Sequence, residues 1–159
     1  MNTVYIALGA NLGEPERTLR ELLDRLQHVP ELARVECSSL YRSAPMGPQD
    51  QPDYVNAVLR AQTNLAPLAL LDFLQHLEDE FGRVRSRRWG ARTLDLDLLL
   101  FANLELHHPR LTVPHPGMTE RDFVLVPLHE LAPELSLPDG RTIGALLDGL
   151  PSHDLVKIT

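Results

Sequence analysis

The chain has 159 residues, enough for one domain with a substantial hydrophobic core. Its formal net charge of -7, from 15 Lys and Arg against 22 Asp and Glu, argues against general binding to nucleic acid or to an anionic membrane. The single cysteine, Cys37, excludes an internal disulfide framework and a cysteine-based zinc site, so we interpret it as a packing residue. No apolar run is long enough to span a bilayer, and the first residues lack the basic region of a signal peptide, so we expect a cytoplasmic protein.

Strands and helices follow one another along the first half of the chain. Short apolar and β-branched runs predict strands, whereas leucines at helical spacing, such as Leu19, Leu22 and Leu26, predict helices with one core-facing side. Proline favours the first turn of a helix and glycine favours its end. In chain order we expect a strand over residues 3–8, a helix from Pro15 that ends before Pro30, strands over residues 35–42 and 54–62, and a helix from Pro67 to Gly82.

The next strand carries two aspartates and follows an arginine-rich stretch. It is expected over residues 94–101, where leucines alternate with a second face made of Asp95, Asp97, Leu99 and Phe101. At strand spacing the Cα atoms of the two aspartates lie about 6.6 Å apart. Carboxylates this close repel each other and are costly to bury, unless a hard cation such as Mg²⁺ binds them together with phosphate oxygens.

Guanidinium groups match phosphate oxygens in shape and charge. Five of them precede or abut the aspartate strand, on Arg83, Arg85, Arg87, Arg88 and Arg92. The region therefore predicts a site for a polyphosphate and a divalent cation. A plain edge strand with a solvated Asp pair and a charged loop before it is the alternative.

Prolines at positions 109, 114 and 116 dominate the following segment, and helical periodicity returns near Thr119. A turn over residues 138–140, a short helix over residues 142–150 and a last strand over residues 155–158 complete the chain. The order strand, helix, strand, strand, helix, strand is that of a ferredoxin-like α+β sandwich, here with a C-terminal helical extension. We expect a single domain over residues 1–159. Because this fold hosts many functions, the function has to come from the site.

Three stretches of the chain, taken in order, resemble one enzyme family. The most specific is Arg88-Trp89-Gly90-Ala91-Arg92-Thr93-Leu94-Asp95-Leu96-Asp97-Leu98-Leu99, and the others are residues 47–56 and 111–115. Over nearly its whole length the chain resembles 6-hydroxymethyl-7,8-dihydropterin pyrophosphokinase, an enzyme family of folate synthesis. The resemblance implies transfer of pyrophosphate from ATP to the hydroxymethyl oxygen of the pterin, with release of AMP and with two Mg²⁺ ions at the site.

The resemblance also implies roles for individual residues. Asp95 and Asp97 correspond to the metal-binding pair and, with Arg83 and Arg92, to the catalytic residues of the family. ATP contacts are expected from Gln75, Glu78, Arg85, Arg88, Leu98, Arg110, Thr112, His115 and Arg121. Pterin contacts are expected from Ser43, Ala44, Met46, Tyr54, Asn56, Trp89 and Phe123. Within this set, the rings of Tyr54 and Phe123 would stack on the flat pterin. The amide of Asn56 would supply both a donor and an acceptor for the polar edge of the pterin.

These residues also have plainer interpretations, because an aromatic side chain is usually a core residue and a single histidine is usually a packed one. The chain departs from the family in having Ser43-Ala44 where Thr-Pro is frequent, Pro116 where an aromatic residue often follows the histidine, and an arginine loop one residue shorter. In the empty enzyme, the four arginines of the loop over residues 82–91 and Arg92 just beyond its end repel one another. We therefore expect this loop to be mobile without ligand and to close when both substrates are present.

Two rival functions stay open at this point. One is another Mg-dependent nucleotidyltransferase or phosphohydrolase that uses Asp95 and Asp97, and it would release pyrophosphate or phosphate in place of AMP. The other is a non-catalytic ligand-binding module, whose binding would survive loss of both aspartates. The expected partners are ATP and 6-hydroxymethyl-7,8-dihydropterin, without nucleic acid or membrane, and the expected oligomeric state is a monomer.

Overall fold

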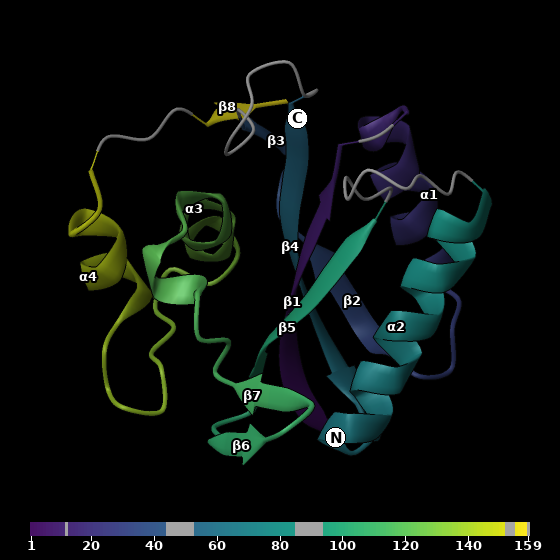
Figure 1. The fold of residues 1–159 in the computed structure, drawn as a ribbon. Helices are drawn as coiled ribbons and strands as arrows, with labels where there is room; N and C mark the ends of the chain where they lie inside the picture. The colour runs from purple at the N-terminus through teal and green to yellow at the C-terminus, as the bar shows by residue number, and fades with distance from the viewer. Residues whose placement is uncertain (12, 44–52, 85–93, 152–154, 159) are drawn as a thin grey trace.

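A central antiparallel sheet, covered by helices on both faces, organises the computed structural model (Figure 1). The structure describes residues 1–11, 13–43, 53–84, 94–151 and 155–158. Helices α1 and α2 cover one face, and α3 and α4 cover the other (Figure 1). Among the described residues, no helix is both long enough and apolar enough to cross a membrane.

The sheet contains the strand order expected of a ferredoxin-like core. Its order is β5-β1-β4-β3-β8, with β2 also paired to β4, and every pairing is antiparallel. The strands of this sheet are β1 (Asn2–Ala10), β2 (Ala33–Cys37), β3 (Tyr41–Ser43), β4 (Tyr54–Thr63), β5 (Asp95–Phe101) and β8 (Val156–Lys157). A separate hairpin consists of β6 (Leu106–His108) and β7 (Leu111–Val113). The helices are α1 (Pro15–Leu26), α2 (Pro67–Val84), the 3-10 turn η1 (Met118–Glu120), α3 (Asp122–Leu131) and α4 (Ile143–Asp148). The α+β prediction with a C-terminal helical extension is confirmed.

The first hydrophobic core lies between the sheet and the helices α1 and α2. The leucine stripe of α1 is fully buried there, as are Leu70, Leu74 and Leu77 of α2. Cys37 packs against the same core, and burial raises the pKa of its thiol to about 12, in keeping with a packing role.

The prediction that α2 ends at Gly82 is wrong, because the helix continues to Val84. A glycine inside a helix costs about 1 kcal/mol relative to alanine, which the buried leucines of a long helix outweigh.

The second core lies on the other face, under α3 and α4. Tyr5, Val58 and Leu99 point into it from the sheet, and α3 contributes Val124 and Leu128. Both faces of the central strands are therefore buried over much of their length.

The strand predicted over residues 35–42 is divided into β2 and β3. Cys37 pairs with Leu59 and Tyr41 pairs with Asn56, so the register shifts by one residue between them. At the break, the hydroxyl of Ser38 accepts a hydrogen bond from the backbone N of Val58 at 3.0 Å, where a regular ladder would supply a backbone carbonyl.

A β-bulge in β5 reverses the faces to which the later side chains of the strand point. Ile6 pairs with Leu98 and Tyr5 pairs with Leu100, so Leu99 is an extra residue in the ladder. Leu99 and Leu100 both pack in the second core, and Phe101 packs in the first. The prediction that Phe101 shares a face with the two aspartates is therefore wrong, because one extra residue moves every later side chain to the opposite face.

Candidate active site

The register of β4, β1 and β5 brings an amide and a carboxylate to either side of one glycine. Gly9 pairs with Asn56 on β4 and with Asp95 on β5, and the next pairing of the same face joins Ala7 to Asp97. Paired residues of antiparallel strands point to the same face, so both aspartates share a face with the asparagine, as the alternation in β5 predicts. They line a cleft of about 520 Å³ together with Gly9, Ser43, Tyr54, Asn56, Glu120, Arg121, Asp122, Phe123 and Leu155.

One wall of the cleft fixes the orientation of the Asn56 amide. The hydroxyl of Ser43 donates a hydrogen bond to Asn56 Oδ1 at 2.7 Å, and the asparagine is only 6% exposed. Its Nδ2 points toward Gly9, since a Cβ atom built on that glycine would lie 3.2 Å from it. The absence of a side chain at Gly9 therefore keeps the floor between the amide and Asp95 open.

The opposite wall presents a cation and an aromatic ring together. The guanidinium carbon of Arg121 lies 5.8 Å from the centre of the Phe123 ring. This guanidinium packs closely over Gly117, where an added Cβ would fall 2.9 Å from it. Phe123 lies in the first turn of α3, so the helix delivers the ring to the edge of the cleft.

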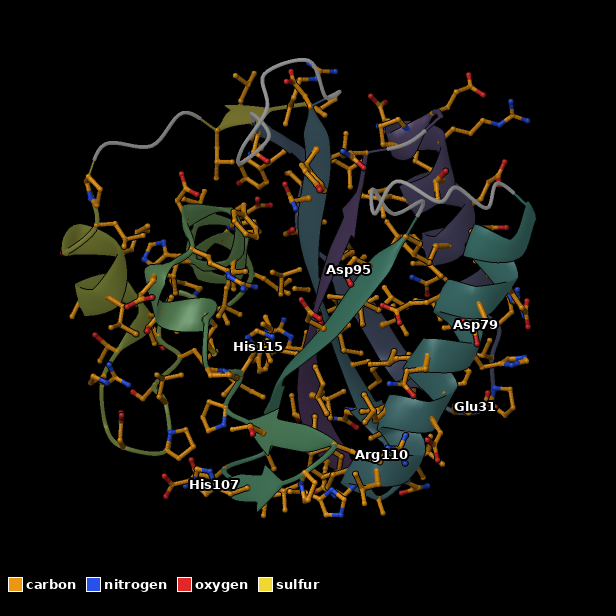
Figure 2. All side chains as sticks on the ribbon, viewed as in Figure 1. Glu31, Asp79, Asp95, His107, Arg110 and His115 are labelled. Carbon is orange, nitrogen blue, oxygen red and sulfur yellow. The ribbon has the colours of Figure 1, made fainter. Side chains whose placement is uncertain are left out.

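His115 is held beside Asp97 by two backbone interactions. Its backbone N donates to the carbonyl of Leu99, the bulged residue, at 2.9 Å, and its Nδ1 accepts from the backbone N of Gly117 at 3.1 Å. Its Nε2 then lies 3.9 Å from Asp97 Oδ2, on the side of β5 that faces η1 and α3 (Figure 2).

The charge state of His115 follows from these surroundings. Burial is the largest influence and lowers the pKa of His115, and the nearby Arg121 acts in the same direction. Asp97 and Asp95 favour the charged form but do not outweigh the burial. The imidazole is therefore mainly neutral at neutral pH, with Nδ1 as an acceptor and Nε2 as the donor.

A second polar group lies along the outer edge of β5, beside α2. Glu78 Oε2 accepts a hydrogen bond from the backbone N of Leu96 at 2.7 Å. One turn earlier on the same helix face, Gln75 Oε1 lies 3.3 Å from the guanidinium of Arg110, which also contacts Asp72 Oδ1 at 2.5 Å. Figure 2 shows Arg110 between the β6–β7 hairpin and α2. Thr112, half-buried in β7, belongs to the same hairpin.

The residues predicted from the sequence thus fall into several groups. Asp95, Asp97 and Arg121 line the cleft with the four described pterin-site residues Ser43, Tyr54, Asn56 and Phe123. Gln75, Glu78, Arg110 and Thr112 lie beside α2 and the hairpin, and His115 lies next to Asp97. The side chain of Leu98 packs in the first core, away from the cleft. Arg83 lies in the last turn of α2, and the predictions for Ala44, Met46, Arg85, Arg88, Trp89 and Arg92, with the mobile loop, fall outside the described residues.

Four cleft residues were not foreseen, namely Gly9, Glu120, Asp122 and Leu155. Gly9 carries a visible signal, a glycine directly after an apolar strand, but only the strand register reveals what it faces. Leu155 is far from the motifs in sequence and reaches the cleft through the pairing of β8 with β3.

The two aspartates are the residues that could hold a metal ion. Within the described ranges, no cluster of three or more His, Cys, Asp or Glu is arranged to bind one. Two carboxylates on one face suit Mg²⁺ better than they suit zinc. Mg²⁺ keeps part of its coordination for water and substrate phosphates, whereas zinc in a structural site favours four protein ligands.

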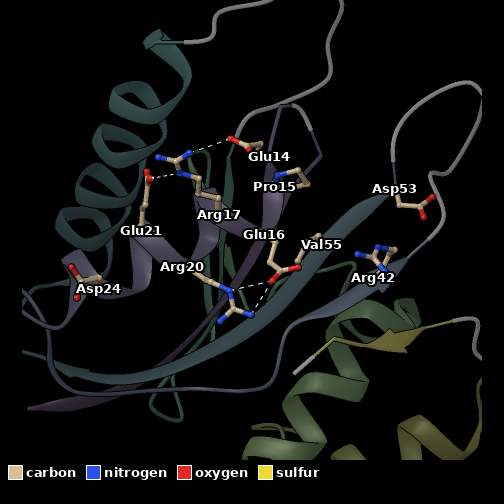
Figure 3. A pocket seen from close by; sticks show the side chains of 10 residues that line it. All are labelled: Glu14, Pro15, Glu16, Arg17, Arg20, Glu21, Asp24, Arg42, Asp53 and Val55. Atoms are coloured by element: carbon tan, nitrogen blue, oxygen red, sulfur yellow. Dashed lines mark hydrogen bonds and ion pairs between the residues drawn. The ribbon is translucent and has the colours of Figure 1, made fainter.

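A larger hollow of about 760 Å³ lies along α1 (Figure 3). Of its three arginines, Arg17 is paired with Glu14 and Glu21, and Arg20 with Glu16. These side chains are exposed, and such pairs contribute little. The hollow contains neither of the two aspartates of β5 nor an aromatic wall, so the smaller cleft is the better candidate for the active site.

Comparisons with known proteins point to one enzyme family. A family model described as 7,8-dihydro-6-hydroxymethylpterin-pyrophosphokinase (HPPK) matches residues 5–133. A relative from Haemophilus influenzae, named 2-amino-4-hydroxy-6-hydroxymethyldihydropteridine pyrophosphokinase, is 50% identical over 99% of both chains. A relative of the same name from Pseudomonas aeruginosa is 53% identical over 98% of this chain and 96% of its own.

Solved structures show the same fold. The structure of Plasmodium falciparum HPPK-DHPS wild type with pteroate superposes with a TM-score of 0.71 at 15% identity, covering 92% of this chain and 42% of that one. At this identity the likeness concerns the fold alone, and the present chain spans less than half of the longer protein. Because the family model spans most of the sequence and named relatives match it nearly end to end, the chain belongs to the 7,8-dihydro-6-hydroxymethylpterin-pyrophosphokinase family.

Proposed function

We propose that the cleft over Gly9 transfers pyrophosphate from ATP to the hydroxymethyl group of 6-hydroxymethyl-7,8-dihydropterin, a step of tetrahydrofolate biosynthesis. The pterin oxygen attacks the β-phosphorus, the bond from this phosphorus to the oxygen bridging it to the α-phosphorus breaks, and AMP leaves. The hydroxyl proton is lost, and the products are AMP and the pterin diphosphate. The observation that carries the proposal is the strand register that brings Asp95 and Asp97 to the same face as Asn56.

The pterin would bind between the two walls of the cleft. Tyr54 and Phe123 offer ring faces for stacking on a flat heteroaromatic molecule. Asn56, oriented by Ser43, offers an amide to the polar edge of the pterin. The open floor at Gly9 lets the hydroxymethyl end lie toward Asp95, where the phosphate chain is expected.

Asp95 and Asp97 would hold two Mg²⁺ ions, and their carboxylate oxygens fit this cation. When bound, such ions neutralise charge on the phosphates and orient the chain for in-line attack. The aspartates themselves supply a negative, half-buried platform that keeps the metal ions next to the pterin slot.

ATP would lie along the outer edge of β5 and reach the cleft at Asp97. Arg110 and Arg121 carry positive charge on the two sides of this path, and the neutral Nε2–H of His115 can donate to a phosphate or to the ribose. Gln75 and Thr112 add polar contacts near Arg110, and Glu78 holds the strand edge through Leu96. The roles of Arg83, Arg85, Arg88, Arg92, Trp89, Ala44 and Met46 stay predictions from the family resemblance.

Further properties of the protein are also proposed. They are a single domain over residues 1–159, a monomer, and a cytoplasmic location, the last in keeping with the single cysteine. The partners would be the two substrates, without nucleic acid.

The deciding experiment measures which products form from ATP. The chain is mixed with ATP, Mg²⁺ and the hydroxymethyl pterin, and AMP, ADP, phosphate and pyrophosphate are counted. Pterin-dependent AMP, formed in a one-to-one ratio with pterin diphosphate, is the expected result. Release of pyrophosphate or phosphate would instead favour a nucleotidyltransferase or a phosphohydrolase.

A further inference from the structure

The C-terminal strand reaches the cleft from the far side of β3. β8 pairs with β3 through Tyr41↔Lys157 and Arg42↔Val156, and the backbone N of Ile158 donates to the carbonyl of Leu40 at 2.8 Å. The same antiparallel register, continued by one residue, brings Leu155 opposite Ser43. The residues that directly follow Leu155 are therefore fixed to β3, which sets the register of Leu155 from its C-terminal side.

A row of three residues then crosses the sheet on the cleft face. Ser43 pairs with Tyr54 on β4, and Leu155 adds an apolar side chain on the other side of the serine. Leu155 is half-buried and lines the cleft, whereas its neighbour Val156 is 58% exposed and points to the other face with Arg42. Because successive side chains of an extended segment alternate between faces, Leu155 points to the cleft and Val156 points away from it.

The chemistry of the remaining lining makes this leucine distinctive. Apart from the rings of Tyr54 and Phe123, the other described residues that line the cleft are glycine, polar or charged. A flat heteroaromatic substrate needs apolar contact along its periphery as well as on its faces, because its carbon atoms gain little from charged neighbours.

We propose that Leu155 is a substrate-binding residue that forms an apolar wall of the pterin slot. This wall lies outside residues 5–133, the part matched by the family model. The inference rests on the proposed function of the cleft, and it extends the site to a strand that no catalytic motif includes. Leu155 would contribute to binding of the pterin and not to binding of ATP.

Three variants of the full chain test the wall. Leu155→Ala removes the contact, Leu155→Met keeps an apolar side chain of similar volume, and Val156→Ala makes a matched change on the opposite face of β8. The dissociation constants of the pterin and of a non-hydrolysable ATP analogue are measured by calorimetry, and the Michaelis constants are measured from AMP formation.

For Leu155→Ala we expect the dissociation constant of the pterin to rise on the order of tenfold, equivalent to about 1.4 kcal/mol, with nucleotide binding within about twofold of the wild type. Leu155→Met and Val156→Ala should bind both ligands like the wild type. Unchanged pterin binding in Leu155→Ala would overturn the inference, and so would equal losses for both ligands, which would assign the leucine to the packing of β8. A wild type that forms no pterin-dependent AMP would overturn the proposed function itself, which keeps the two failures distinct.

Discussion

Gly9 lies at the centre of the candidate site although it has no side chain. Its neighbours across the sheet are Asn56 on one side and Asp95 on the other, so it lies between the proposed pterin-binding end and the proposed metal-binding end. The positive backbone φ angles among the described glycines are those of Gly13 and Gly140, so Gly9 does not require glycine for its conformation. The requirement there is one of space.

This requirement gives the first prediction, for Gly9→Ala. The new methyl group would lie 3.2 Å from Asn56 Nδ2, closer than ordinary contact, and would occupy the cleft floor. We expect a folded protein whose Michaelis constant for the pterin rises on the order of tenfold, or about 1.4 kcal/mol, while that for ATP changes little. Steady-state kinetics and thermal unfolding measure both effects. Normal pterin binding in a variant of normal stability would show that the floor is not part of the slot.

The second prediction concerns Asp97→Asn, which keeps the size of the side chain and removes its charge. Turnover should fall more than about a hundredfold, since metal ions supply several kcal/mol to phosphoryl transfer. The melting temperature should change little, because the residue lies at the cleft and not in a core. Asp79→Asn, an exposed carboxylate of α2 remote from Asp95 in Figure 2, is the control and should remain active. Near-normal turnover of Asp97→Asn at ordinary Mg²⁺ would contradict the assigned role.

At the scale of elements, the sequence predicts which core strands and helices form better than it predicts the face to which each side chain points. Residues 98–100 are all leucine, so any of them can enter either core, and the alternation gives no sign that Leu99 is the bulged residue. The bulge matters because the freed carbonyl of Leu99 anchors His115. The break at Ser38 is equally hidden, since it depends on a side-chain hydrogen bond to β4.

Helix α3 is attached to the sheet at the end opposite to Phe123. Glu130 accepts hydrogen bonds from the backbone N and hydroxyl of Ser39, both at 3.0 Å to Oε2, and from the hydroxyl of Tyr41 at 2.5 Å. Arg60 of β4 donates to the carbonyl of Leu131 at 3.3 Å. A helix of this length measures about 15 Å at about 1.5 Å per residue, so the two attachments set where its first turn meets the cleft.

The third prediction follows from the charge of Glu130. Burial alone would raise the pKa of Glu130, but the hydrogen bonds from Tyr41 and Ser39 outweigh it and lower the pKa. A carboxyl with a lowered folded-state pKa stabilises the protein above its unfolded value of about 4.3 and loses that contribution as the pH falls through the folded value. Glu130→Gln should therefore be less stable than the wild type at pH 7, by less than about 1 kcal/mol for such an exposed group, and equally stable near pH 3.

Thermal unfolding of both proteins across this pH range measures the difference. Glu134→Gln, at another exposed position just beyond α3, is the control and should differ little from the wild type at every pH. A stability difference between wild type and Glu130→Gln that persists unchanged at pH 3 would show that the charge is not what stabilises the attachment.

At the scale of the whole molecule, two cores share one sheet. Leu22 of α1 is fully buried in the first core and Leu128 of α3 is fully buried in the second. Because β1 and β4 contribute side chains to both, neither core can open without disturbing the other. The sequence predicts the first core well, since its helices are long and periodic. It predicts the β6–β7 hairpin poorly, because strands of three residues leave no periodic pattern.

The fourth prediction compares Leu22→Ala with Leu128→Ala. Each should lower the free energy of unfolding by about 2–5 kcal/mol and leave a single calorimetric transition. Below the melting temperature, Leu128→Ala should also weaken pterin binding, because α3 carries Phe123, whereas Leu22→Ala should bind the pterin normally. Two separate transitions in either variant would show that the cores unfold independently.

The placement of β8 has a practical consequence for protein engineering. An affinity tag or fusion partner attached after Thr159 would begin three residues beyond Lys157, the end of the short strand that follows Leu155. One attached before Met1 would begin at the opposite end of β1, where Asn2 lies about 23 Å from Gly9 at strand spacing. Reporter proteins, immobilisation chemistry and solubility tags therefore belong at the amino end if the enzyme is to be assayed unhindered.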